Sequence, residues 1–258
     1  SISEFSMKIF EIEPSPSPIS NIFIENSLID RIEVTALGNF AGKIVSNVVI
    51  RNCILGRSQT IATPIINLIN DNTSPTSVLI TNNVIMGTSS TSAANGSVNT
   101  FNAIIKNNLF LGNDASDFAF GTVESSTIAN NIFYGRAPRS DVAASEIINS
   151  TFDNNISFGN TDNSFATGTG IIENGSIFTD PQLSFSAVDD WDFAFDPTIP
   201  PGSPAENTGN DGTDIGLTGG TLPFSTTGTP LPIIQVLRFP EIIRQGTNVD
   251  ATIEAEGN

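Results

Sequence analysis

The chain alternates short apolar runs with breaks that are rich in Asn, Gly and Ser, and one such unit recurs along its length. Each copy reads as a short strand, an Asn-Asn corner, a second strand and a Gly. The clearest copies are Val49–Gly56, Ile80–Gly87, Ile105–Gly112, Ile128–Gly135 and Phe152–Gly159. The Gly positions lie 31, 25, 23 and 24 residues apart, which is typical of a solenoid and not of a coiled coil or a propeller.

The apolar residues of each copy are Val, Ile, Leu and Phe, which suit strands with one face in a core. Asn tolerates the left-handed backbone conformation, so an Asn pair can turn the chain sharply. If one repeat forms one coil, neighbouring coils pair in parallel about 4.8 Å apart. The side-chain amides of the second Asn then stack as a hydrogen-bonded ladder, which we predict for Asn83, Asn108, Asn131 and Asn155.

The predicted fold class is therefore all-β. We expect a right-handed, single-stranded parallel β-helix, a solenoid, with a short C-terminal β extension. The expected divisions are an N-terminal segment at 1–20, β-helix coils at 21–178, a closing segment at 179–220, and a linker with a β-strand tail at 221–258. The N-terminal segment contains Pro14-Ser-Pro-Ser-Pro18, a density of Pro that an interior strand does not tolerate.

The closing segment is expected to cover the C-terminal end of the solenoid, with Trp191, Phe193 and Phe195 as its apolar plug. The tail contains two strand-like runs within 233–258. These runs begin another domain, add to the edge of the β-helix, or dock on a partner. Ser1 opens in the middle of a pattern and no signal peptide precedes it, as expected of a chain that has lost a signal and an N-terminal cap.

The repeats resemble those of pectate-lyase-like bacterial proteins with a parallel β-helix. A second set of motifs follows the last repeat in a fixed order, namely Phe178–Leu183, Asp189–Phe193, Pro201–Glu206 and Thr213–Gly216. This order resembles the DP, PGSPA and DIG motifs that close many secreted β-helix proteins. The resemblance covers about residues 21–220, and it implies a bacterial protein that is secreted or lies on the cell surface. Leu183, Leu217 and Glu206 depart from the residues that are usual there.

Charge narrows the expected partners, because 27 Asp and Glu outnumber 10 Lys and Arg and give a net charge of −17. Nucleic acid and anionic membranes, which bind clustered Lys and Arg, are therefore not expected as partners. No apolar stretch reaches the 18 residues or so of a membrane span. Histidine is absent, which removes the commonest general base and zinc ligand, and the single cysteine, Cys53, is expected in the core.

The best catalytic candidates are Arg136, Arg139 and Asp141, which cluster in one insert. A polysaccharide lyase needs a base and a cation that neutralises the substrate's carboxylate. The competing interpretation is that the two arginines are solvated loop residues. We expect a non-catalytic extracellular or cell-surface module that binds a glycan or a protein, or serves surface architecture, within a larger protein or complex. The alternative is a polysaccharide lyase or glycoside hydrolase that acts in a surface groove.

No cofactor is expected, with calcium as the alternative. Asp211, Asp214 and Asp189 are the calcium candidates, because they supply hard oxygen ligands near glycines. The same residues are common in turns. Carbohydrate recognition would use exposed aromatic residues, and core packing is the competing role for each. The candidates are Phe101, Phe118, Phe120, Tyr134 and Phe165.

Overall fold

The computed structural model describes residues 19–33, 45–56, 64–69, 75–87, 96–115, 117–140, 147–188, 190–224, 233–238 and 252–256. The chain divides into two compact units, Ser1–Phe224 and Ser225–Asn258. Every helix or strand element among the described residues is a strand, which confirms the all-β prediction. None of the described residues forms a helix long and apolar enough to cross a membrane.

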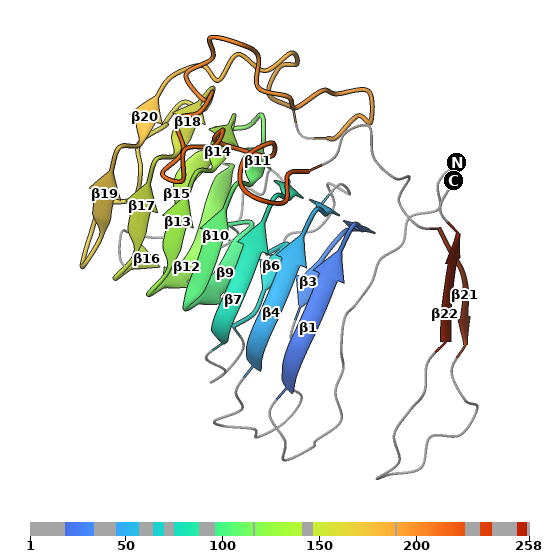
Figure 1. Cartoon of the computed structure of the whole chain (residues 1–258). Coiled ribbons are helices and arrows are strands. Elements are labelled where there is room, and N and C mark those ends of the chain that lie inside the picture. Colours follow the sequence, from blue (N-terminus) through green and yellow to red (C-terminus); the bar gives the residue numbers. More distant parts are fainter. Residues whose placement is uncertain are drawn as a thin grey trace. The chain divides into compact units, whose positions relative to one another are not determined.

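The first unit is built from three parallel sheets (Figure 1). Sheet I contains β1 (Ile19–Glu25), β4 (Val45–Arg51), β7 (Thr76–Thr81), β10 (Ala103–Lys106), β13 (Thr127–Ala129), β17 (Thr151–Asp153) and β19 (Ile172–Asn174). Sheet II contains β2 (Leu28–Ile29), β5 (Ile54–Leu55), β8 (Val84–Ile85), β11 (Leu109–Leu111), β14 (Ile132–Tyr134), β18 (Ile156–Phe158) and β20 (Ile177–Phe178). Sheet III contains β3 (Ile32–Glu33), β6 (Ile66–Asn67), β9 (Val98–Phe101), β12 (Phe118–Glu124) and β15 (Ala137–Ser140), with β16 (Ile147–Ile148) also paired to β12.

Apart from β15 and β16, which both pair with β12, strands of the first unit that follow one another along the chain fall in different sheets, and strands one coil apart pair in parallel. For example, β7 pairs with β10, and β8 pairs with β11. This arrangement confirms the predicted parallel β-helix.

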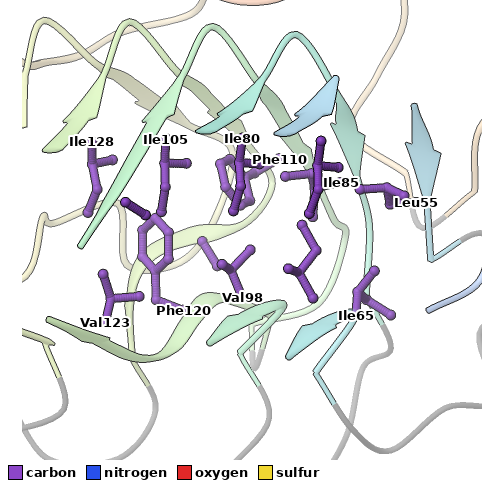
Figure 2. Packing of buried hydrophobic residues seen from close by; sticks show 14 of the residues in the cluster. Leu55, Ile65, Ile80, Ile85, Val98, Ile105, Phe110, Phe120, Val123 and Ile128 are labelled. Atoms are coloured by element: carbon purple, nitrogen blue, oxygen red, sulfur yellow. The ribbon is translucent and has the colours of Figure 1, made fainter. Parts of the chain in front are cut away.

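The interior is a column of apolar residues contributed by every coil. In sheet I the inward column is Ile24, Ile50, Ile80, Ile105, Ile128 and Phe152, all buried. Figure 2 shows Ile80, Ile105 and Ile128 facing Val98, Phe120 and Val123 of sheet III across this core. Cys53 is also buried there, as expected, and loss of solvation raises the pKa of its thiol to about 12.

The two residues of each Asn-Asn corner have different roles. The first Asn adopts the left-handed conformation, with φ of 53° at Asn82 and 54° at Asn107 and Asn130. A second column of left-handed corners lies five residues earlier in each coil, at the other end of the sheet I strands. Its members are Asn21, Asn47, Ser77, Asn102, Ser125 and Asn149.

The second Asn of each corner forms the predicted ladder, which the structure confirms. Nδ2 of Asn83 donates to Oδ1 of Asn108 at 3.0 Å, and the same 3.0 Å bond joins Asn108 to Asn131 and Asn131 to Asn155. All four side chains are buried. Each Nδ2 also donates to a backbone carbonyl one coil earlier, such as Ile105 O for Asn131, at 2.8–2.9 Å.

The closing segment lies along the outer face of sheet II and not over the end of the coils, so that expectation is wrong. The outward column of sheet II is apolar. Side chains of the closing segment, among them Trp191, Ile215 and Leu217, bury this column. Its buried members are Ile54, Val84, Leu109, Ile132 and Ile156. The physical reason is area, because a side face spanning several coils offers more apolar surface than one coil end.

The first Asn of each corner binds this segment. Asn154 donates to Thr208 O at 2.9 Å, and Asn130 donates to Asn210 Oδ1 at 3.0 Å. Asn107 donates to Gly216 O at 3.4 Å, and Asn82 donates to Leu217 O and Gly219 O at 2.9 Å. The segment therefore returns from the last coils towards earlier ones, as its orange and red trace in Figure 1 shows.

The C-terminal end of the core is filled by Phe165, a residue of the insert after β18. Its ring lies 5.6 Å from the Phe152 ring and 5.3 Å from the Phe178 ring. Phe178 itself is 63% exposed, and Phe193, expected in the plug, is also exposed. Glu173 occupies the position that continues the inward isoleucine column, next to Phe152, and it accepts a hydrogen bond from the Ser176 N–H.

The second unit contains an antiparallel pair, β21 (Ile233–Arg238) and β22 (Thr252–Glu256). Both strands fall in the part of the tail where the sequence predicts strands. The three alternatives for this tail, that it begins another domain, adds to the edge of the β-helix or docks on a partner, stay predictions.

Replacing Asn131 by Ala should destabilise the solenoid. The change removes the acceptor of the buried Asn108 backbone N–H and the amide donor to Ile105 O, and each buried unsatisfied group costs roughly 1–3 kcal/mol. The free energy of unfolding from chemical denaturation measures this loss. Asn174→Ala, at an exposed position of β19, is the matched control and should change stability by less than about 0.5 kcal/mol. Equal stabilities of the two variants would contradict a structural ladder.

Replacing Glu173 by Ile should promote end-to-end association of the protein. The substitution extends the inward apolar column to a coil end whose edge strands, β19 and β20, are the last of their sheets, and a charge at such an edge opposes association. Sedimentation velocity over a concentration series should show larger species for Glu173→Ile. Asn174→Ile, one residue away but outside that column, should resemble the parent protein, and a strictly monomeric Glu173→Ile would refute the expectation.

Candidate functional site

Arg136 is an internal residue that links neighbouring coils. It is 1% exposed, and its Nε, Nη1 and Nη2 donate to Leu111 O, Phe118 O and Gly87 O, each at 3.0 Å. The three carbonyls belong to segments up to 49 residues away in the chain. Arg136 therefore holds together the corner between sheets II and III, and the expectation that it is a solvated loop residue is wrong.

The charge of Arg136 is balanced by Asp117, which is also fully buried. The Arg136 Nη2 and Asp117 Oδ1 atoms lie 3.6 Å apart. The other carboxylate oxygen, Oδ2, accepts hydrogen bonds from the N–H groups of Asn113 and Asp114 at 2.9 and 2.8 Å. Arg136 and Asp117 therefore stabilise the fold of the insert that follows β11.

Arg139 lies three residues further along, in β15, and its side chain is partly exposed to solvent, unlike that of Arg136. Its Nη2 forms an ion pair with Asp162 Oδ2 at 2.8 Å, and its guanidinium lies 5.5 Å from the Phe118 ring centroid. Both charged side chains are partly exposed. The hydroxyl and N–H of Ser164 donate to the Asp162 carboxylate and lower its pKa, and Arg139 lowers it further.

The structure thus places the two described catalytic candidates, Arg136 and Arg139, in different environments and not in one site. Arg136 is buried, Arg139 is at the surface of sheet III, and Asp141 lies outside the described residues. The partner of Arg139 is Asp162, from a different insert, which the sequence cluster did not include. The sequence contains no local pattern that indicates which inserts become neighbours when the coils stack, so this ion pair could not be predicted.

The calcium candidates stabilise turns of the closing segment. Asp211 Oδ1 accepts from the N–H and hydroxyl of Thr213, and Asp214 Oδ1 accepts from the Asn207 N–H. Asp189 lies outside the described residues. In the part of the chain that the structure describes, no three Asp, Glu, Cys or His side chains form a group able to hold a metal ion.

The aromatic candidates for carbohydrate recognition divide into buried and partly exposed residues. Phe120, Phe165 and Tyr134 are buried, and the Tyr134 hydroxyl donates to Phe185 O at 2.8 Å. Phe101 and Phe118 are partly exposed, and Phe118 lies under Arg139. Core packing therefore accounts for three of the five.

The most extensive candidate surface is the outer side of sheet I, here called the open face. Its central column is Phe23, Val49, Leu79, Ile104, Thr127, Thr151 and Ile172, one residue from each strand in register. Phe23 is 60% exposed and Ile104 is 49% exposed, and Val49 and Leu79 are partly exposed. The sequence repeat placed apolar residues in these strands but did not show which of them point outward.

Polar columns flank the open face on both sides. On one side stand the left-handed corner residues from Asn21 to Asn149, all of them exposed. On the other side the charged residues are Glu25, Arg51, Lys106 and Asp153, two anions and two cations. Glu25 and Arg51 form an ion pair at 2.7 Å. The face is thus neutral, although the chain carries a net charge of −17.

Comparison of the chain with protein-family models, with curated proteins and with solved structures gives no match. What the chain itself shows is a parallel β-solenoid with buried Asn ladders. Its functional interpretation therefore depends on the geometry of its surfaces.

Replacing Arg136 by Met should destabilise the protein strongly. The change leaves the Asp117 carboxylate buried without its cation, which typically costs about 3–5 kcal/mol. Adding Asp117→Asn should recover part of that loss. Arg139→Met removes an exposed ion pair and serves as the matched control, with an expected effect of about 1 kcal/mol or less. Chemical denaturation distinguishes these cases, and a fully stable Arg136→Met protein would argue against the structural role.

Proposed function

We propose that the chain is a non-catalytic module that works outside the cell or on its surface and binds a glycan or a protein partner through the open face. One observation carries the proposal. The chain buries the apolar outer column of sheet II under its own closing segment, but leaves the apolar outer column of sheet I exposed. An exposed apolar column on a regular sheet is typical of an interaction surface.

The scaffold suits binding because it is preorganised. The ladder and the inward isoleucine column hold successive coils in register, so the face needs little ordering when a partner arrives. The net charge of −17 supports solubility in an extracellular setting and disfavours anionic partners.

The proposed location and family follow from the resemblance of the repeats and of the DP, PGSPA and DIG motifs to secreted pectate-lyase-like proteins. On this proposal the module is part of a larger surface protein or complex, and the tail at 233–258 connects it to a neighbour.

The alternative function, a polysaccharide lyase, is supported by Arg139. Its guanidinium is partly exposed above the Phe118 ring and beside Asp162, on sheet III. A cation in that position could neutralise a substrate carboxylate.

Incubation of the intact protein with neutral and uronic-acid polysaccharides separates the two functions. We expect that affinity electrophoresis detects binding and that no new reducing or unsaturated ends form. Cleavage that Arg139→Ala abolishes would establish the lyase and refute the non-catalytic function. Asp211→Ala is the control for that arm, because Asp211 is an exposed charged residue that contacts Thr213 on the closing segment and belongs neither to sheet III, which carries Arg139, nor to the open face.

A further inference from the structure

We propose that the open face binds a single extended, neutral polysaccharide chain that runs parallel to the solenoid axis, with one sugar residue per coil. This inference rests on the binding function proposed above and names the ligand class for the same face.

The spacing of the face is the first argument. Neighbouring strands of a sheet lie about 4.8 Å apart, so each column of the open face repeats with that period. A sugar residue in an extended β-linked chain has nearly the same length. A chain laid along the axis therefore meets the same kind of contact at each coil, beginning with Phe23, Val49, Leu79 and Ile104.

The width of the apolar column is the second argument. It is one side chain wide, and polar columns border it two residues away on either side. Four residues along a strand and six strand spacings give a face of about 13 by 29 Å, or roughly 380 Å². A stable protein interface buries about 800 Å² on each partner, so the face is too small for one but fits one linear chain.

The chemistry of the columns is the third argument. A sugar ring presents C–H groups on its faces and hydroxyls around its edge. The central column supplies apolar contacts, including the Phe23 ring, and the corner column supplies exposed amides and hydroxyls at Asn47, Ser77 and Asn102. Two of these amides are already oriented, because Asn47 donates to Asn21 Oδ1 and Asn102 donates to Pro75 O.

Charge selects a neutral chain. The two cations and two anions beside the central column cancel, and Arg51 is already paired with Glu25. The rest of the protein is strongly acidic and repels a polyanion at long range. The second polar column can still hydrogen-bond sugar hydroxyls through Lys106 and Asp153.

The test measures the affinity of the intact protein for neutral β-linked oligosaccharides of increasing length by titration calorimetry. Affinity should rise with length and level off near seven sugars, the number of strands in sheet I. Ile104→Asn should weaken binding about tenfold, as expected when one apolar contact is lost. Phe193→Asn is the matched control, because Phe193 is equally exposed, at 49%, but lies on the closing segment, and it should leave affinity unchanged.

Three outcomes would overturn the inference. Glycan binding that Ile104→Asn leaves unchanged would remove the open face as the site and would refute the proposed function as well, whereas each of the next two outcomes would refute the ligand class alone. Tighter binding of a uronic-acid polymer than of neutral chains would refute the ligand class. Concentration-dependent dimerisation abolished by Ile104→Asn, without glycan binding, would show that a second copy covers the face.

Discussion

The hydrogen bonds between the second asparagines of successive corners determine where each coil turns, and the rest of the solenoid depends on that spacing. Every amide in the ladder binds a carbonyl of the preceding coil. All but the last also bind the next Asn, and the last, Asn155, contacts Ser176 Oγ, so one coil cannot shift without breaking bonds on both sides. A one-residue slip would also move the isoleucine column from the core to solvent. The ladder thus specifies register at the same place where the core supplies most of the hydrophobic stabilisation.

The Asn-Asn pair also explains how one repeat builds both an interior and an exterior. A left-handed first residue turns its side chain outward, where Asn82, Asn107, Asn130 and Asn154 bind the closing segment, while the second residue points into the ladder. The first Asn of each corner supplies these contacts at regular spacing. The closing segment can therefore cover sheet II over several coils although its own sequence is not periodic. Sheet I has no such covering from the described residues of the closing segment, and its apolar column stays exposed.

The repeat allowed the fold and the ladder to be predicted, because both are periodic in the sequence. The second corner column could not be predicted because Ser replaces Asn at Ser77 and Ser125. Beside it, the hydroxyls of Ser126 and Ser150 accept from the N–H groups of Ala103 and Ser126 and so join only three coils. The burial of Arg136 and the position of Phe165 could not be predicted, since both depend on contacts between inserts of unequal length. Neither insert contains a pattern that indicates its partner.

The open face differs from the core in what its residues must do. The inward column must be apolar to fold, and it is isoleucine in five coils and phenylalanine in the sixth. The outward column has no such requirement, because Thr127 and Thr151 occupy it in coils that stack as well as the others. Folding therefore does not account for Phe23 or Ile104 on the surface, where exposed apolar side chains on a sheet favour unwanted association. The ligand that we propose for this column would supply that physical reason.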